Sequence, residues 1–173
     1  HDAQEARGLG DVYKRQILPH ENMASREPEF EQYDKQVQGR IHTETGLADA
    51  GVMAPFNSEN YPKEIRNVGI ALSTDHNPRY GLIDPYWGGV NAVVEAMRKV
   101  AAVGATPNAI TDCLCFCNTE KSPQMWEFVE SVQGVADACH AITLKDNPDD
   151  ATPIIAGNVS FYNESSNGAI PPS

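Results

Sequence analysis

The chain has 173 residues, which is enough for one domain with a hydrophobic core and too few for two well-developed ones. Its formal net charge is −11, with 13 Lys and Arg against 24 Asp and Glu. This argues against a nucleic-acid-binding surface, which needs clustered basic side chains. No apolar run approaches the roughly 20 residues that cross a bilayer, so no membrane-spanning helix is expected.

The N-terminal segment differs in origin from the rest of the chain. Its run RGLGDVYKRQ, Arg7–Gln16, matches the translation of a transposon adapter used to prepare sequencing libraries. Residues 1–16 are therefore interpreted as non-native and are expected to be disordered and dispensable. Residues 17–40 are polar and rich in Glu, Gln and Arg, which indicates a connecting arm, and residues 41–173 are predicted to form the folded domain.

The first half of the predicted domain contains strands, loops and one clear helix. Short segments with Gly and Pro over 41–62 are typical of strand and loop, and the run at 67–75 predicts a strand that ends in turn-forming residues. The segment from Gly88 to Pro107 predicts an amphipathic helix. Gly104 is placed to cap this helix, and Pro107 prevents it from continuing.

The second half predicts a strand, a helix and another strand. A strand over Asn108–Phe116 precedes a helix with Ser122 as N-cap and an apolar face formed by Met125, Phe128, Val129, Val132, Ala136 and Cys139. An acidic loop, KDNPDD, leads to a last strand over Ile154–Ala156. This alternation predicts an α/β domain with helices packed on a mixed sheet.

Four polar or glycine positions are candidate site residues. Asp112 lies in an apolar strand, where a carboxylate turns to solvent, caps another group, or meets a cation or a ribose. In AGNVS, Gly157 lets a ligand approach the backbone, while Asn158 and Ser160 supply oxygen ligands that suit Mg²⁺. The competing interpretation of AGNVS is an ordinary exit from a strand into a turn.

The cysteines and one histidine are weaker candidates. Cys113, Cys115 and Cys117 alternate along the predicted strand and so share one face, but the second pair of a zinc site is missing, which favours small buried side chains. Of the four cysteines, which include Cys139, these three are crowded into five positions, a spacing poorly suited to a set of disulfide bonds. This spacing favours a protein of the reducing cytoplasm. His76 follows a predicted strand, but no partner nucleophile is visible, so it is not among the catalytic candidates.

The chain resembles one enzyme family in three stretches, STDHNPRYGLIDPYWGGVNAVVEAMRKVAAVGATPNAITDCLCF, SPQMWEFVESVQGVADACHAI and AGNVSFYNES. They are similar to parts of phosphoribosylformylglycinamidine synthase, the large synthetase subunit of purine biosynthesis. The resemblance runs from about Glu21 to Ser173 and corresponds to an internal fragment, which includes the N-terminal domain of that protein's second half.

The resemblance implies a fold, a reaction and site residues. The family belongs to the aminoimidazole-ribonucleotide-synthetase-like superfamily, whose N-terminal domains pair to close a barrel, so this chain is expected to be half of a pseudo-dimeric barrel. The family converts formylglycinamide ribonucleotide to formylglycinamidine ribonucleotide with ATP, Mg²⁺ and ammonia from a glutaminase subunit or domain. By resemblance, Asp112 and Gly157 contact ATP, Asn158 holds Mg²⁺, and Ser160 contacts the ribonucleotide.

Some features depart from the family, and two alternatives stay open. The family usually has Asn and Gly where this chain has Cys115 and Cys117, and its acidic loop is usually shorter than residues 146–150. Its catalytic histidine and C-terminal domain lie outside this chain, so no catalytic residue is assigned and the fragment alone is expected to be inactive. The alternatives are a non-catalytic half that holds a structural nucleotide, and another ATP-dependent member of the superfamily.

Overall fold

The computed structural model describes residues 14–20, 23–25, 27, 39–44 and 46–173. The chain divides into two compact units, His1–Gly39 and Arg40–Ser173. In the first unit, residues 14–17 form one helical turn, so the predicted disorder does not hold for residues 14–16. The rest of the predicted adapter and most of the predicted connecting arm lie outside the described residues. Where the chain is described, no helix is both long and apolar enough to cross a membrane.

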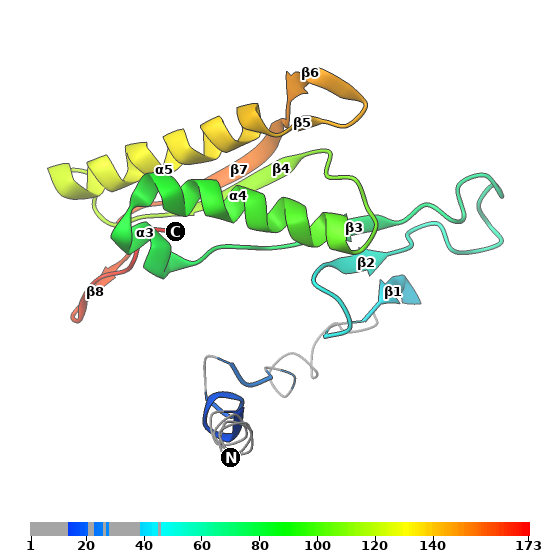
Figure 1. The fold of residues 1–173 in the computed structure, drawn as a ribbon, viewed down its shortest axis with the longest axis horizontal. Coiled ribbons are helices and arrows are strands. Elements are labelled where there is room, and N and C mark those ends of the chain that lie inside the picture. Colours follow the sequence, from blue (N-terminus) through cyan, green and yellow to red (C-terminus); the bar gives the residue numbers. More distant parts are fainter. Residues whose placement is uncertain (1–13, 21–22, 26, 28–38, 45) are drawn as a thin grey trace, which may run out of the picture. The chain divides into compact units, whose positions relative to one another are not determined.

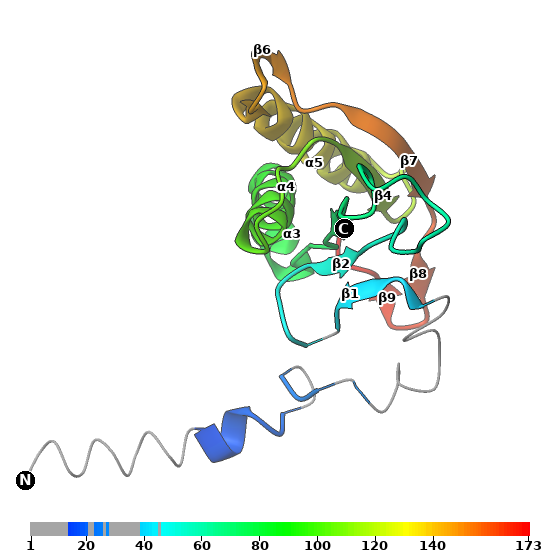
Figure 2. The same cartoon turned by 90° about the vertical axis from the view of Figure 1, so that its right-hand side faces the viewer.

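Two helices and two parallel strands form the layered part of the second unit. α4 (Pro85–Ala102) and α5 (Ser122–Ala141) lie side by side along the parallel pair of β4 (Ile110–Cys115) and β7 (Ile154–Ser160) (Figures 1 and 2). Ile110 packs against the buried core cluster, which consists of Val93, Met97, Ala138 and Cys139. The predicted α/β class is confirmed.

The remaining strands form separate small sheets. β1 (Ile41–Thr43), β2 (Gly51–Met53) and β3 (Ile70–Leu72) make one antiparallel sheet. Two hairpins are formed by β5 (Thr143–Leu144) with β6 (Asn147–Ala151), and by β8 (Glu164–Ser165) with β9 (Gly168–Ala169). The described strands do not join into the predicted mixed sheet, because β3 ends at Leu72 and the chain continues to α3 (Pro78–Ile83) without further pairing.

Capping interactions are found at both ends of α4, and the C-terminal one agrees with the prediction. At its start, the Asp84 side chain accepts a hydrogen bond from the Trp87 backbone N–H at 3.1 Å, which satisfies one free donor of the first turn. At its end, Gly104 has a φ of 85°, and the N–H groups of Gly104 and Ala105 donate to carbonyls of the last turn. This is a Schellman motif, so the predicted capping role of Gly104 is confirmed.

α5 differs from its prediction at its start and on its buried face. The Met125 N–H donates to the Lys121 carbonyl at 3.0 Å, so Lys121 is the N-cap and Ser122 lies inside the helix. The predicted apolar face leaves Met125, Val129 and Val132 exposed. Cys139 of the predicted face is buried, as expected, and the other buried residues of α5 are Ser131, Gly134 and Ala138.

Two glycines explain which face of α5 is buried. A Cβ on Gly134 would overlap the Tyr86 carbonyl oxygen, and a Cβ on Gly89 would overlap the Ser131 carbonyl oxygen. Because glycine has no Cβ, the backbones of α4 and α5 can approach closely at these two points. Small residues of α5 therefore approach α4, while Met125, Val129 and Val132 stay exposed. Phe128 is half-buried and packs against Phe116 and Phe161.

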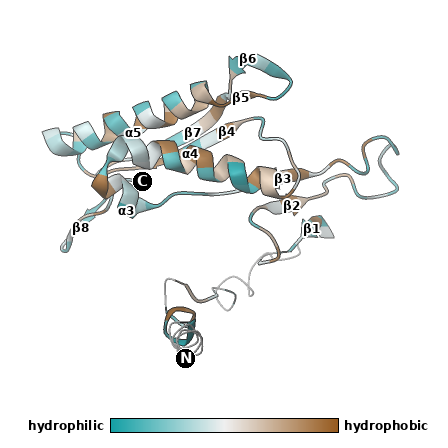
Figure 3. Ribbon diagram, in the orientation of Figure 1, coloured by the Kyte–Doolittle hydropathy of each residue, from teal (hydrophilic) through white to brown (hydrophobic). Residues whose placement is uncertain are grey.

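The C-terminal region also differs from its prediction. β7 continues to Ser160 instead of ending at Ala156, because it pairs with β4 as far as Cys115. Gly157 and its neighbours therefore belong to a strand, and the interpretation of AGNVS as an exit into a turn is wrong. The acidic segment KDNPDD, predicted as a loop, contains most of β6, which Figure 3 shows as hydrophilic.

The close helix crossing gives a stability prediction. We expect Gly134→Ala to destabilise the chain by about 2–3 kcal/mol, because the added methyl group overlaps the Tyr86 carbonyl and helix propensity recovers only about 1 kcal/mol. Urea unfolding measures this loss. Val129→Ala, at an exposed position of α5, is the control and should change stability by less than about 0.5 kcal/mol. Equal stabilities of the two variants would contradict the close crossing.

Candidate functional site

Asp112 and Gly157 meet across the parallel strand pair. The register of β4 and β7 pairs them directly, so both residues lie on the same face. A Cβ on Gly157 would overlap the Asp112 carboxylate. The missing side chain of Gly157 thus leaves the space that the half-buried Asp112 side chain occupies.

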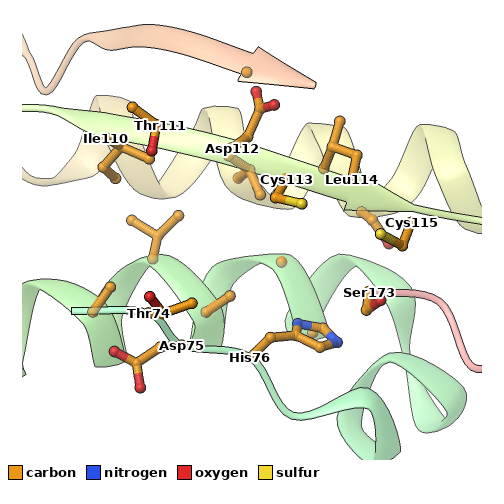
Figure 4. Close-up of a pocket in the computed structure, with 18 of the residues that line it drawn as sticks. Thr74, Asp75, His76, Ile110, Thr111, Asp112, Cys113, Leu114, Cys115 and Ser173 are labelled. Atoms are coloured by element: carbon orange, nitrogen blue, oxygen red, sulfur yellow. The ribbon is translucent and has the colours of Figure 1, made fainter. Parts of the chain in front are cut away.

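Asn158 and Ser160 lie on the opposite face of the strand pair. They are paired with Cys113 and Cys115, and alternation along each strand places these four side chains on one side. Figure 4 shows Asp112 pointing to one side of β4 and the two cysteines to the other. The Cys113 thiol donates a hydrogen bond to Asn158 Oδ1, with a Sγ–Oδ1 distance of 3.3 Å.

The structure therefore brings the four predicted site residues into one short stretch but divides them between two faces. A single ligand that contacts all four has to reach around β7. Within the described part of the chain, β7 pairs with β4 alone, and every residue of β7 is exposed. The edge of β7 that faces away from β4 is thus open to a ligand.

A cavity of about 850 Å³ lies beside β4 (Figure 4). Its walls come from the segment after β3, from α4 and α5, and from β4 and β7. Asp112, Gly157 and Asn158 line the cavity, whereas Ser160 does not. This volume lies in the usual range for small-molecule pockets, so three of the four predicted site residues border a space of suitable size.

An ion pair between a buried carboxylate and a partly exposed lysine holds one wall of this cavity. The Asp75 side chain is only 3% exposed and pairs with the ammonium group of Lys99 on α4. Ser73 Oγ lies 3.0 Å from Asp75 Oδ2, and Glu95 Oε1 lies 3.2 Å from Lys99 Nζ. The hydrogen bond to Asp75 raises the pKa of Lys99, so the lysine stays charged and ties residues 73–76 to α4.

The C-terminal residues complete the same wall. His76 Nε2 lies 3.1 Å from the Pro172 carbonyl oxygen and donates to it. Ser173 and Cys115 exchange both of their backbone hydrogen bonds, at 3.1 and 2.6 Å, as directly opposed residues of antiparallel strands do. His76 therefore connects the segment after β3 to the C-terminal residues.

Two of the cysteine thiols have a raised pKa. Burial raises the pKa of the Cys115 thiol, and the neighbouring Cys113 raises it further. Burial also raises the pKa of Cys139 in the core. Because the thiolate is the reactive form, Cys115 and Cys139 are weak nucleophiles at neutral pH.

The donor atoms around Asn158 fit Mg²⁺ as an ion with few protein ligands. In the described residues, no three side chains of His, Cys, Asp or Glu gather closely enough to hold a metal ion. Mg²⁺ commonly takes one or two protein oxygens and completes its coordination with phosphates and water. Asn158 Oδ1 accepts one hydrogen bond from Cys113 and keeps a second lone pair for a cation. Asn158 thus offers one oxygen that could serve as a Mg²⁺ ligand.

Sequence comparison identifies relatives over most of the chain. Residues 48–171 match the family described as AIR synthase related protein, N-terminal domain. The chain is 54% identical over 157 residues to the phosphoribosylformylglycinamidine synthase subunit PurL of Methanothrix thermoacetophila, with coverage of 91% of this chain and 20% of that protein. It is 40% identical over 156 residues to the protein of the same name from Thermomicrobium roseum, with coverage of 90% and 19%. The chain thus spans about a fifth of these relatives.

Solved structures of Thermotoga maritima PurL are similar in fold. The PurLQS structure superposes with a TM-score of 0.67 at 30% identity, over 86% of this chain and 22% of that chain. PurL complexed with ATP gives a TM-score of 0.65 at 30% identity, with the same coverage. PurL complexed with FGAR gives 0.50 at 26% identity, over 77% of this chain and 17% of that chain. The resemblance predicted from the sequence is confirmed.

The contact between Asp112 and Gly157 predicts coupled effects of substitution. We expect Gly157→Ala to destabilise the chain by about 1–3 kcal/mol, because its Cβ overlaps the Asp112 carboxylate. In an Asp112→Ala background the same change should cost nothing, since the carboxylate is gone and alanine suits a strand at least as well as glycine. Urea unfolding of the two single variants and the double variant completes the cycle. Additive effects would contradict the contact.

Proposed function

We propose that the chain, which belongs through residues 48–171 to the family described as AIR synthase related protein, N-terminal domain, supplies part of the ATP site of a phosphoribosylformylglycinamidine synthase. That enzyme is an ATP-dependent carbon–nitrogen ligase, which converts formylglycinamide ribonucleotide to formylglycinamidine ribonucleotide with ammonia from glutamine. The observation that carries the proposal is the 54% identity to a PurL subunit over 91% of this chain. The fold shared with a PurL complexed with ATP supports the nucleotide as its ligand.

Each predicted site residue has a proposed role. Asp112 and Gly157 contact ATP, with Gly157 contributing its main chain because the Asp112 carboxylate fills the space of a side chain. Asn158 Oδ1 holds Mg²⁺, which neutralises phosphate charge when it is bound. Ser160 contacts the ribonucleotide through its hydroxyl. These roles fit the open edge of β7, from which a ligand can reach residues on both faces of the strand.

The rest of the enzyme lies outside this chain. We infer that the domain pairs with a homologous half to close a pseudo-dimeric barrel, and that a glutaminase subunit or domain supplies the ammonia. A reducing cytoplasm suits an enzyme with four free cysteines. The proposal keeps the predicted division of the chain into a translated adapter at residues 1–16, a connecting arm at 17–40 and the domain at 41–173.

The chain by itself should not catalyse the reaction. Because its relatives are about five times longer, most of a complete active site has to come from other segments. We expect no formylglycinamidine ribonucleotide when the purified chain is incubated with formylglycinamide ribonucleotide, ATP, Mg²⁺ and ammonia. Turnover by the isolated chain, measured by product mass, would contradict the fragment interpretation.

The role of Asn158 is tested in the complete protein that carries this chain. Asn158→Leu deletes one oxygen ligand at nearly constant volume, so it should weaken ATP binding about tenfold with Mg²⁺ and hardly at all without it. Ser160→Ala is the control, because it should weaken only the ribonucleotide, by about 1 kcal/mol. Calorimetric titration of each ligand measures both effects. If Mg²⁺ still enhances ATP binding in Asn158→Leu as in the parent, the metal role is excluded. ADP that stays bound and never exchanges would instead favour the alternative of a structural nucleotide.

A further inference from the structure

We propose that Cys113 is a positioning residue for Asn158: its thiol holds the amide so that Oδ1, rather than the NH₂ group, is presented in a fixed orientation for Mg²⁺. The inference rests on the proposed function, in which Asn158 binds the metal. Cys113 does not touch the ion itself. It acts through a hydrogen bond to the ligand, as groups that orient metal ligands commonly do.

The geometry places the two side chains together. Cys113 and Asn158 are directly paired residues of β4 and β7, and their Sγ and Oδ1 atoms are 3.3 Å apart. The Asn158 side chain is exposed, so packing does not restrict its amide strongly. In the part of the chain that the structure describes, this thiol is the group that hydrogen-bonds to the Asn158 amide. The orientation of the amide therefore depends on Cys113.

The chemistry of the thiol selects the correct end of the amide. An S–H group donates, so it favours the carbonyl oxygen over the NH₂ group, which is itself a donor. The oxygen has two lone pairs, and the thiol uses one of them. The other lone pair remains for a cation. A sulfur without its proton can only accept, so it would attract the NH₂ group and turn the oxygen away.

Cys115 provides a matched control on the same strand. It lies on the same face as Cys113 but is paired with Ser160, and it makes no contact with Asn158 among the hydrogen bonds of the described residues. Cys113 is exposed, Cys115 is half-buried, and Cys117 and Cys139 are buried. Reagents that modify thiols should therefore reach Cys113 first.

The experiment uses the complete protein that carries this chain and measures ATP binding by calorimetry over a series of Mg²⁺ concentrations. Cys113→Ala should raise the Mg²⁺ concentration for half-maximal enhancement of ATP binding about threefold, with unchanged binding in the absence of metal. Cys113→Ser keeps a donor and should recover most of this loss. Cys115→Ala should behave like the parent protein.

A chemical modification gives a second test, in which Cys113 itself is not substituted. In the Cys115→Ala protein, methyl methanethiosulfonate replaces the Cys113 thiol proton with a methylthio group and releases methanesulfinate. Modification confirmed at Cys113 by peptide mass should reproduce the threefold shift, and dithiothreitol, which reduces the mixed disulfide, should reverse it.

The outcomes separate this inference from the proposed function. In one outcome, Mg²⁺ no longer enhances ATP binding in Asn158→Leu, while Cys113→Ala and the methylthio protein bind ATP like the parent. The positioning role is then overturned, and the metal role of Asn158 stands. If Asn158→Leu itself matches the parent, both are overturned. A threefold shift in Cys113→Ala that serine restores, with none in Cys115→Ala, supports the positioning role.

Discussion

The parallel register between β4 and β7 determines how the candidate site is arranged. Side chains alternate along a strand, so a shift of one residue would exchange the faces of every residue in β7. In the observed register, Gly157 lies opposite Asp112 and leaves space for its carboxylate. A residue with a Cβ at this position would collide with Asp112, so this glycine and the register support each other. The same register brings Asn158 beside Cys113 on the other face.

The crossover through α5 holds this register. Parallel strands cannot be joined by a tight turn, and here α5 and the β5–β6 hairpin connect them. The glycine contacts fix α5 against α4. After the hairpin, the Thr152 N–H donates to the Cys139 carbonyl at 3.0 Å and its hydroxyl donates to the Ile142 carbonyl at 2.7 Å. Because Thr152 is buried, β7 starts from a fixed point at the end of α5.

Local signals predict the parts of the structure that local interactions determine. The end of α4 could be predicted because Gly104 acts within one turn of the helix. The buried face of α5 could be predicted only in part, as at Cys139, because the close approach of Gly134 to Tyr86 depends on another helix. β7 is longer than predicted because pairing with β4 overrides the turn preference of Gly157 and Asn158. The site residues could be named from the sequence, but their faces and the Asp75–Lys99 ion pair depend on contacts between distant segments.

Charge explains why a cation should accompany a phosphorylated ligand at this site. The chain has a net charge of −11, and Asp112, unlike Asp75, has no ion-pair partner in the described part of the structure. Two like unit charges about 4 Å apart repel by about 4 kcal/mol near a protein surface, so the triphosphate that we propose to bind beside Asp112 would need neutralisation. Asn158 carries no net charge. In the proposed function, an amide at this position would therefore leave both positive charges of Mg²⁺ to offset the phosphates, whereas a carboxylate would offset one of them.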